Sequence, residues 1–314
     1  MSVVKILVTG GAGNIGGSLA RKLVENKNYF VVIVDNLLTG ETEKLPASQD
    51  TNWKFIKADV NSYKDIAPIF GKYHFDYVFH YAAVVGVKRT LANPLMVFDD
   101  IDGIRNILSL AKNTDVKRVF FSSSSEVYGE PVEFPQHEVT TPLNSKLPYA
   151  IVKNLAESMV KAYNKDFGLN YTIFRFFNTY GKLQSEDFVL PRFLRAALKN
   201  EPISLYGDGL QTRTFCYIED NLETTIRILE KDLCINEVIN IGHDKEMTIL
   251  ELAKSIIALT GSKSEIRHLP SLPEGDMTRR CPDNSKMQEI LGHSLITLEE
   301  GIRKIIAYYK ETSQ

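Results

Sequence analysis

A tyrosine and a lysine four residues apart, Tyr149 and Lys153, are the residues of this 314-residue chain whose spacing most directly suggests chemistry. The surrounding pattern predicts a helix over residues 148–167, so both side chains share one of its faces. An ammonium group beside a phenol favours the phenolate and lowers the pKa of the tyrosine. Such a tyrosine takes a proton from a hydroxyl group as a general base and returns it as a general acid. Tyr149 is therefore the predicted proton-transfer residue.

Two further candidates, Ser124 and Glu126, follow a predicted strand over residues 119–121. Ligands of open α/β sheets bind outside the carboxyl ends of the strands, which is where Ser124 lies. Its hydroxyl can share a hydrogen bond with the substrate oxygen that Tyr149 deprotonates. Glu126 either supplies a second acid or base or braces its own loop through backbone N–H groups. With Tyr149 and Lys153, these residues form the predicted catalytic set.

The catalytic set must be positioned by the surrounding fold, whose first feature is a glycine-rich loop near the N-terminus. Residues 3–8 are typical of a buried parallel strand, and residues 11–16 match the G-x-G-x-x-G fingerprint, with a helix expected from Ser18. Phosphates bind at such a helix N-terminus. A second strand, residues 30–34, ends in Asp35, about twenty residues past the loop, where a carboxylate bonds a ribose 2′-hydroxyl and repels a 2′-phosphate. The pattern predicts an NAD site.

Strands and helices then alternate, which predicts an α/β fold with a Rossmann-type doubly wound parallel sheet. We expect further strands at 55–60, 77–83, 119–121 and 171–176, and helices at 94–113 and 148–167. After residue 177 the alternation fades. The expected organisation is an NAD-binding domain at 1–177, which also receives a strand near 238–241, and a smaller mixed α/β substrate-binding lobe at 178–314.

Composition argues against several classes of protein. The formal net charge is -2 and there is no tract of Lys and Arg, so nothing favours nucleic-acid binding. No apolar run has the length that a bilayer span needs. The three cysteines are widely separated, and neither they nor the histidines have metal-ligand spacing. The first strand leaves no room for a signal peptide. We therefore expect a cytoplasmic protein without a metal site and without a membrane or nucleic-acid partner.

Taken together, these motifs resemble the extended short-chain dehydrogenase/reductase family, which contains NAD-dependent nucleotide-sugar epimerases, dehydratases and decarboxylases. The resemblance rests on the glycine loop, Asp59-Val60, the sequence His80-Tyr81-Ala82-Ala83, Ser124 and the Tyr149/Lys153 pair. It extends through residues 175–181, 206–209 and 211–213, and so covers almost the whole chain. It implies NAD as the cofactor, a nucleotide sugar as the substrate, and a homodimer joined through the helices near 94–112 and 148–166.

The resemblance also implies binding residues. The cofactor would be held by Gly10, Gly13, Asn14, Ile15, Gly16, Asp35, Asn36, Asp59, Val60, Ala82, Ala83, Tyr149 and Lys153. The substrate would be held by Ser124, Asn178, Val189, Arg192, Tyr206, Arg213 and Arg280. Asn178 and the arginines at 213 and 280 would hold the diphosphate, since a guanidinium pairs bidentately with phosphate. Asp100 stands where many relatives carry an asparagine near the nicotinamide ribose.

The reactions of these relatives share an opening step in which Tyr149 takes the proton of the sugar C4 hydroxyl and the C4 hydride passes to NAD. We expect a 4-epimerase acting on a UDP-sugar. The alternatives are a UDP-glucuronate decarboxylase or a nucleotide-sugar 4,6-dehydratase that uses Glu126, and, more distantly, a non-catalytic NAD-binding scaffold. The pair Ser125-Glu126 and residues 279–283 are decarboxylase-like, whereas residues 146–148 lack the arginine that many decarboxylases place before the tyrosine.

Overall fold

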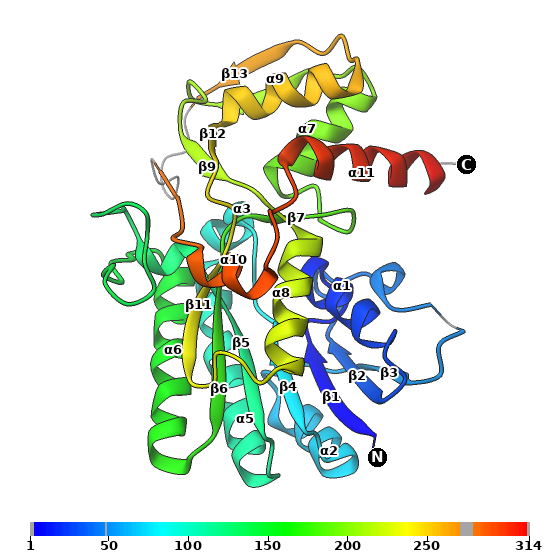
Figure 1. The fold of residues 1–314 in the computed structure, drawn as a ribbon, viewed down its shortest axis with the longest axis vertical. Coiled ribbons are helices and arrows are strands. Elements are labelled where there is room, and N and C mark those ends of the chain that lie inside the picture. Colours follow the sequence, from blue (N-terminus) through cyan, green and yellow to red (C-terminus); the bar gives the residue numbers. More distant parts are fainter. Residues whose placement is uncertain (1–2, 48, 271–278, 313–314) are drawn as a thin grey trace.

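A seven-stranded sheet forms the centre of the computed structural model, which describes residues 3–47, 49–270 and 279–312 (Figure 1). The strand order is β11-β6-β5-β4-β1-β2-β3, and every neighbouring pair is parallel. The strands are β1 (Val4–Thr9), β2 (Tyr29–Asp35), β3 (Trp53–Lys57), β4 (Tyr77–His80), β5 (Arg118–Ser124), β6 (Asn170–Phe176) and β11 (Glu237–Ile241). The predicted Rossmann-type α/β fold is confirmed.

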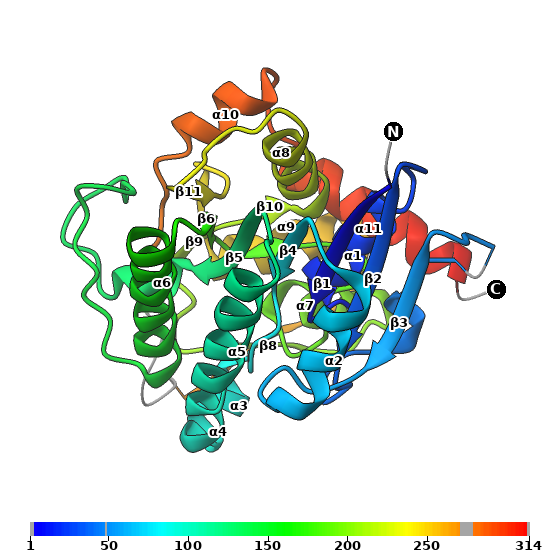
Figure 2. The same ribbon diagram turned by 90° about the horizontal axis from the view of Figure 1, so that it is seen from below.

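Helices cover both faces of this sheet, which is why its central strands are apolar on both sides. On one face lie α1 (Asn14–Leu23) and α8 (Ile218–Glu230); on the other lie α2 (Tyr63–Tyr73), α5 (Asp100–Asn113) and α6 (Pro148–Phe167) (Figure 2). Successive side chains of a strand point to opposite faces. In β1, Ile6 and Val8 accordingly belong to one core cluster and Leu7 to the other.

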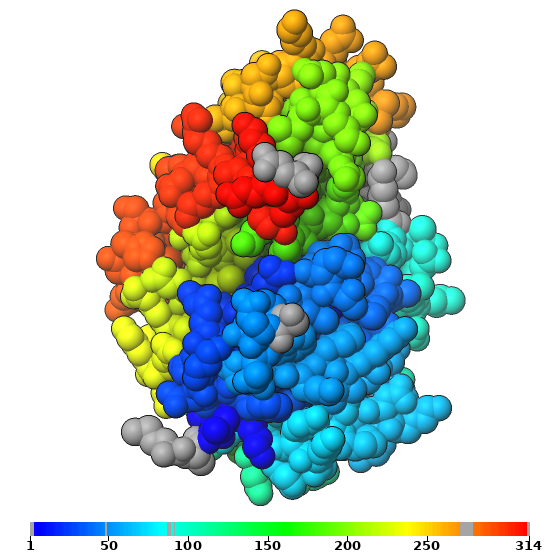
Figure 3. Space-filling view, turned by 90° about the vertical axis from the view of Figure 1, so that its right-hand side faces the viewer, coloured from blue at the N-terminus to red at the C-terminus, as the bar shows by residue number. Residues whose placement is uncertain are grey.

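A smaller group of elements lies beyond the carboxyl ends of the strands (Figures 1 and 3). It contains β7 (Thr179–Tyr180), α7 (Val189–Leu198), β8 (Ile203–Tyr206), β9 (Thr212–Thr214), β10 (Cys216–Tyr217), β12 (Glu246–Thr248), α9 (Ile249–Thr260), β13 (Ile266–Leu269) and α11 (Leu298–Thr312). Helix α10 (Ser285–Leu291) instead packs against α8 and β11 at the edge of the sheet. Phe193 and Ile203 of this lobe share a core cluster with Ile6 of the sheet. Between the two parts the chain returns once to the sheet, through β11 beside β6. The domain boundary at residue 177 stays a prediction.

Several elements differ from the sequence-based expectation in their bounds: β4 ends at His80 rather than at residue 83, and β5 extends over 118–124 rather than 119–121. Helix α1 begins at Asn14 rather than Ser18, because glycines without side chains can form its first turn against the loop. The expected helix over 94–113 is divided into α4 (Pro94–Phe98) and α5, and the first residue of α5, Asp100, turns a buried carboxylate inward. Strand β3 ends at Lys57, so Asp59 lies in the following loop. Among the described residues, no helix has the length and apolar character needed to cross a bilayer.

Candidate active site

A cavity of about 740 Å³ opens at the carboxyl ends of the strands, where the sheet meets the smaller lobe. All the predicted cofactor residues line it: Gly10, Gly13, Asn14, Ile15, Gly16, Asp35, Asn36, Asp59, Val60, Ala82, Ala83, Tyr149 and Lys153. Ser124, Glu126, Asn178, Val189 and Arg280 line it as well. The structure therefore brings together most of the residues that the sequence singled out, although their individual roles stay predictions.

The glycine loop is packed too tightly to carry side chains. Gly10 has a φ of +66°, and a Cβ on it would lie 2.6 Å from the backbone nitrogen of Ala82. A Cβ on Gly16 would strike the backbone of Gly10. Gly11, the first residue of the fingerprint, faces the Ile33 side chain of β2 and does not belong to the cavity lining. Gly10, which the resemblance assigns to the cofactor, therefore lines the cavity, whereas Gly11, the first glycine of the fingerprint spacing, does not.

Asp35 ties this loop to the next one. Its carboxylate accepts hydrogen bonds from the backbone N–H of Ala12 at 3.0 Å and of Leu37 at 2.8 Å. Asn14, in the first turn of α1, has a buried Oδ1 with no hydrogen-bond partner among the described residues. The loop thus offers a close backbone approach and a free buried polar atom, and a carboxylate lies at the end of the adjacent strand. This arrangement fits a dinucleotide.

Lys153 lies beneath the catalytic end of the cavity. Its Nζ donates a hydrogen bond of 2.7 Å to the carbonyl of Ser122 and lies 4.9 Å from the ring centre of Phe121 and 5.8 Å from that of Tyr149. Burial lowers the pKa of Lys153 to about 8, while the charges of Asp100 and Glu157 act in the opposite direction. The charged form of Lys153 is therefore less favoured here than that of a lysine in water.

The environment of Tyr149 departs from the expectation drawn from its spacing to Lys153. Burial raises the pKa of the Tyr149 phenol well above its usual value, and the negative charge of Glu126 raises it further. A hydrogen bond with Ser124 and the charge of Arg280 lower the pKa, but by less. In the protein alone, desolvation thus outweighs the effect expected from the lysine. The lowered tyrosine pKa that we predicted is wrong for this state.

Glu126 and Arg280 form an ion pair of 2.6 Å inside the cavity, with side chains that are 14 % and 7 % exposed. Glu126 lies in the 3-10 turn η2 (Ser125–Tyr128), where its backbone N–H donates to the Ser124 hydroxyl at 3.2 Å. The second carboxylate oxygen of Glu126 and the Nε of Arg280 are buried without a hydrogen-bond partner among the described residues. The resemblance implied that Arg280 binds the diphosphate, and that role stays a prediction. In the structure its guanidinium lies beside the catalytic residues, where it pairs with Glu126 and its charge acts on Tyr149.

Asp100, the departure from the family pattern, has a buried carboxylate that accepts a hydrogen bond of 2.9 Å from the Val84 N–H. Burial raises the pKa of this carboxyl, and the charge of Lys153 is one of the effects that lower it. Asp100 lines the cavity together with Lys153, and the charge of each of these two groups affects the pKa of the other. The position can contribute a charge as well as a hydrogen bond.

The remaining predicted substrate residues lie apart from this lining. The Arg192 guanidinium lies 5.6 Å from the Tyr206 ring centre, and the buried Arg213 donates to the carbonyl of Thr212 at 2.7 Å. Sequence reasoning missed a different arginine, Arg89 of α3 (Val87–Ala92), which lines the cavity and pairs with Asp187 at 3.0 Å. No motif surrounds Arg89, so only the fold reveals its position.

Comparison with known proteins identifies the family of the chain that forms this cavity. Residues 6–242 match the model of the NAD dependent epimerase/dehydratase family. The chain belongs to this family. NAD is accordingly its cofactor. The family match includes the glycine loop, Asp35 and the catalytic set, and confirms the resemblance drawn from the motifs.

Relatives of this epimerase/dehydratase family member differ in their reactions. The chain is 36 % identical to a UDP-N-acetyl-alpha-D-glucosaminuronate decarboxylase of Bacillus cytotoxicus, with 98 % of each chain covered. It is 35 % identical to a putative UDP-glucose 4-epimerase of Methanocaldococcus jannaschii, over 98 % of this chain and 99 % of the relative. The structure of a UDP-glucose 4-epimerase of Thermotoga maritima, solved with UDP-glucose, matches with a TM-score of 0.92 at 32 % identity. The match covers 99 % of this chain and 100 % of that one.

Proposed function

We propose that this family member acts on a UDP-hexuronate and removes its C6 carboxylate as CO2 after oxidation at C4. The observation that carries the proposal is the ion pair inside the cavity between the buried Arg280 and the largely buried Glu126. This pair changes the order of the sequence-based alternatives, in which a UDP-sugar 4-epimerase came first.

The opening step needs only Tyr149, Lys153 and Ser124. The Tyr149 phenolate takes the proton of the C4 hydroxyl while Ser124 shares a hydrogen bond with the same oxygen. Lys153, fixed by the Ser122 carbonyl, places a positive charge below the phenol. NAD, when bound, supplies the hydride acceptor for C4 and a positive charge in the cavity. The glycine loop and Asp35 would hold it.

Epimerisation at C4 gives the buried ion pair no chemical task, because it moves only the hydride and the proton that Tyr149 carries. In decarboxylation the C5–C6 bond breaks, its electron pair moves onto the 4-keto oxygen, and C5 then takes up a proton. The C4 carbonyl would finally receive the hydride back from the cofactor and the proton back from Tyr149, so the net loss is CO2 alone. The guanidinium of Arg280 can bind the C6 carboxylate by its free Nε, and Glu126 can position a proton donor at C5. Burying such a pair is costly, so stability alone is a weak reason for it.

A UDP-sugar 4-epimerase is the second candidate. It is favoured by the similarity to the Thermotoga maritima 4-epimerase and by the absence of an arginine in the residues 146–148 that precede Tyr149. A 4,6-dehydratase would use Glu126 to take the C5 proton, but it has no need of a cation beside that carboxylate.

Mass spectrometry of the products separates these reactions. The protein is incubated with NAD and, in separate samples, UDP-glucose, UDP-N-acetylglucosamine, UDP-glucuronate and UDP-N-acetylglucosaminuronate. We expect a product lighter by CO2 from one of the two uronates. An unchanged mass with inverted C4 stereochemistry by NMR would replace the proposal with the epimerase, and a product lighter by water would replace it with the dehydratase.

We further infer that the protein is a cytoplasmic homodimer. Support for the dimer comes from helices α4 and α6, which pack against each other and expose the apolar side chains of Leu95, Phe98, Ile151 and Leu155. Light scattering after gel filtration tests this expectation, and a monomer mass would exclude it. Leu155→Glu is expected to shift the protein towards the monomer.

A further inference from the structure

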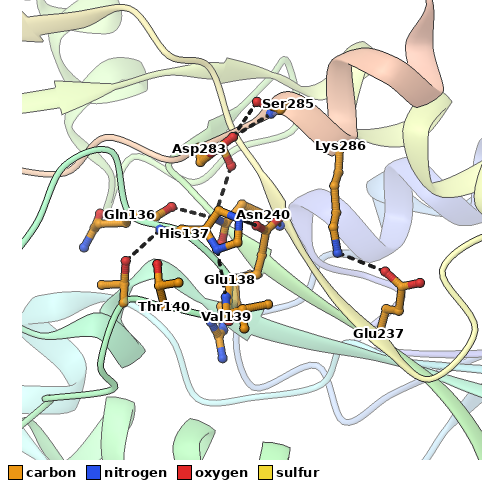
Figure 4. Close-up of polar contacts among 12 residues, drawn as sticks. Gln136, His137, Glu138, Val139, Thr140, Glu237, Asn240, Asp283, Ser285 and Lys286 are labelled. Carbon is orange, nitrogen blue, oxygen red and sulfur yellow. Dashed lines mark hydrogen bonds and ion pairs between the residues drawn. The ribbon is translucent and has the colours of Figure 1, made fainter.

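Asn240 is fully buried near the end of β11, outside the cavity lining, and its side chain bonds segments far apart in the sequence (Figure 4). Its Oδ1 accepts a hydrogen bond of 2.7 Å from the Tyr128 hydroxyl. Its Nδ2 donates to the carbonyl of Gln136 at 2.8 Å and to that of Asp283 at 3.2 Å. One amide group therefore holds three segments together.

Two of these contacts lead to the two partners of the ion pair. Tyr128 closes the turn η2 that contains Glu126, two residues away. Asp283 follows Arg280 by three residues, and the intervening segment is bonded along Gln136: the Gln136 N–H donates to the Cys281 carbonyl, and the Asp283 N–H donates to the Gln136 carbonyl, both at 2.8 Å. The position of Arg280 thus depends on a segment that Asn240 holds.

The surroundings of Asn240 are buried and polar. Its backbone N–H donates to Oε1 of Glu138 at 2.9 Å, and the Tyr128 hydroxyl accepts a hydrogen bond of 2.9 Å from Arg175. Arg175 is in turn bonded to both carboxylate oxygens of Glu157, at 2.9 and 2.7 Å. All these side chains are buried. Because an unpaired buried polar group is costly, the Asn240 amide has one favoured orientation.

We propose that Asn240 is a positioning residue that fixes where the Glu126–Arg280 pair lies relative to Tyr149. An ion pair between two loops fixes the distance between its two side chains, but it does not fix where the pair lies in the cavity. A buried residue that bonds both loops does so. This inference rests on the proposed function, in which the pair acts on C5 and C6 of the sugar, and a misplacement of about 1 Å can cost roughly 100-fold in rate.

Two substitutions separate the contacts of the amide. Asn240→Asp keeps the acceptor for Tyr128 but removes the donor to Gln136 and Asp283, so it releases the segment that carries Arg280. Tyr128→Phe removes the contact to η2 and is the milder change. The matched control is Asn52→Asp, since the Asn52 amide also donates to backbone carbonyls, those of Val24 and Tyr29 at 3.0 Å and that of Asn26 at 3.4 Å. Asn52 directly precedes β3, at the opposite edge of the sheet from β11.

We expect Asn240→Asp to lower kcat for CO2 release by roughly 10- to 100-fold while NAD affinity, measured by calorimetry, is unchanged. Tyr128→Phe is expected to lower kcat less, and Asn52→Asp to leave it unchanged. In an Arg280→Lys background, Asn240→Asp should cost much less than in the wild type, because both changes act through the same guanidinium. If instead the fold-loss in kcat of the double variant equals the product of the two single-variant losses, the proposal is overturned.

Hydrogen exchange gives a readout that does not need turnover. The backbone amides of Cys281, of Asp283 and of the residues in η2 should exchange faster in Asn240→Asp than in the wild type or in Asn52→Asp. If the wild type releases no CO2 from any uronate but exchange rises as expected, the proposed function fails and the positioning role stands. If the wild type decarboxylates and Asn240→Asp matches it in kcat and exchange, the positioning role fails.

Discussion

The two ends of the cavity are built in different ways. The cofactor end comes from consecutive elements, β1, α1 and β2, with the glycine loop and Asp35 at their junctions. The catalytic end is assembled from segments far apart in the sequence: Ser124 at the end of β5, Glu126 in η2, Tyr149 and Lys153 on α6, and Arg280 before α10. The first end is local in the chain, whereas the second exists only when the fold is complete.

This difference separates binding from reaction. Changes at the cofactor end should alter the affinity for NAD and therefore slow every reaction equally. Changes at the catalytic end should leave NAD bound and alter what happens to the sugar. Four substitutions, taken from the largest expected effect to the smallest, test whether the two ends are separable in this way.

Tyr149→Phe should abolish turnover, with a loss of about 1000-fold, within the range that general acid–base residues contribute. The phenylalanine fills the same space, so NAD affinity should stay unchanged. Product formation by mass spectrometry and NAD binding by calorimetry measure the two effects. Tyr63→Phe, at an exposed position on α2, is the control. A Tyr149→Phe variant with wild-type turnover would exclude this tyrosine as the proton-transfer residue.

Glu126→Gln should lower CO2 release by about 100-fold, since the amide breaks the pair with Arg280 and cannot act as an acid or base. The 4-keto sugar formed before this step should be released and be visible by mass spectrometry. Glu299→Gln, exposed on α11, is the control. An epimerase would lose only a few-fold in rate, so a small effect with inverted C4 product favours the second candidate.

Sequence reasoning succeeded where chemistry is encoded locally. The strand-loop-helix of residues 3–23, Asp35 and the Tyr149/Lys153 pair are each specified by neighbours in the chain. The fingerprint spacing alone begins at Gly11, but the resemblance named Gly10, and Gly10 is the glycine of this adjacent pair that lines the cavity, since Gly11 faces Ile33.

Contacts between distant segments were not predictable from local pattern. The resemblance implied a diphosphate role for Arg280, which stays a prediction, but its ion pair with Glu126 had no signal in the local sequence. The pair forms because the chain returns through β11 and brings residues 279–284 onto the loop at Gln136. The high pKa of Tyr149 likewise depends on how completely the assembled fold buries it. Asn240 had no signal at all in the sequence.

Lys153, at the catalytic end, provides a test by pH. Its pKa is lowered to about 8 by burial, so between this value and the unfolded value the native state binds fewer protons than the unfolded chain. Stability should therefore rise with pH. From about pH 7.5 to about pH 9.5, the unfolding free energy of the wild type minus that of Lys153→Met should increase by about 2 kcal/mol. Denaturant titrations measure it, with exposed Lys64→Met as the control. A flat difference would contradict the burial of a titrating ammonium.

Asp35→Asn tests the cofactor end alone and should have the smallest effect. The amide can accept only one of the two N–H groups that the carboxylate binds, and its NH2 group would face the other. It also removes the charge that repels a 2′-phosphate. We expect NAD to bind about tenfold more weakly and the preference for NAD over NADP to fall, as calorimetry with both dinucleotides would measure. At saturating NAD the ratio of CO2 release to 4-keto release should equal that of the wild type. If that ratio changes, the two ends of the cavity are coupled, and the separation between binding and reaction does not hold.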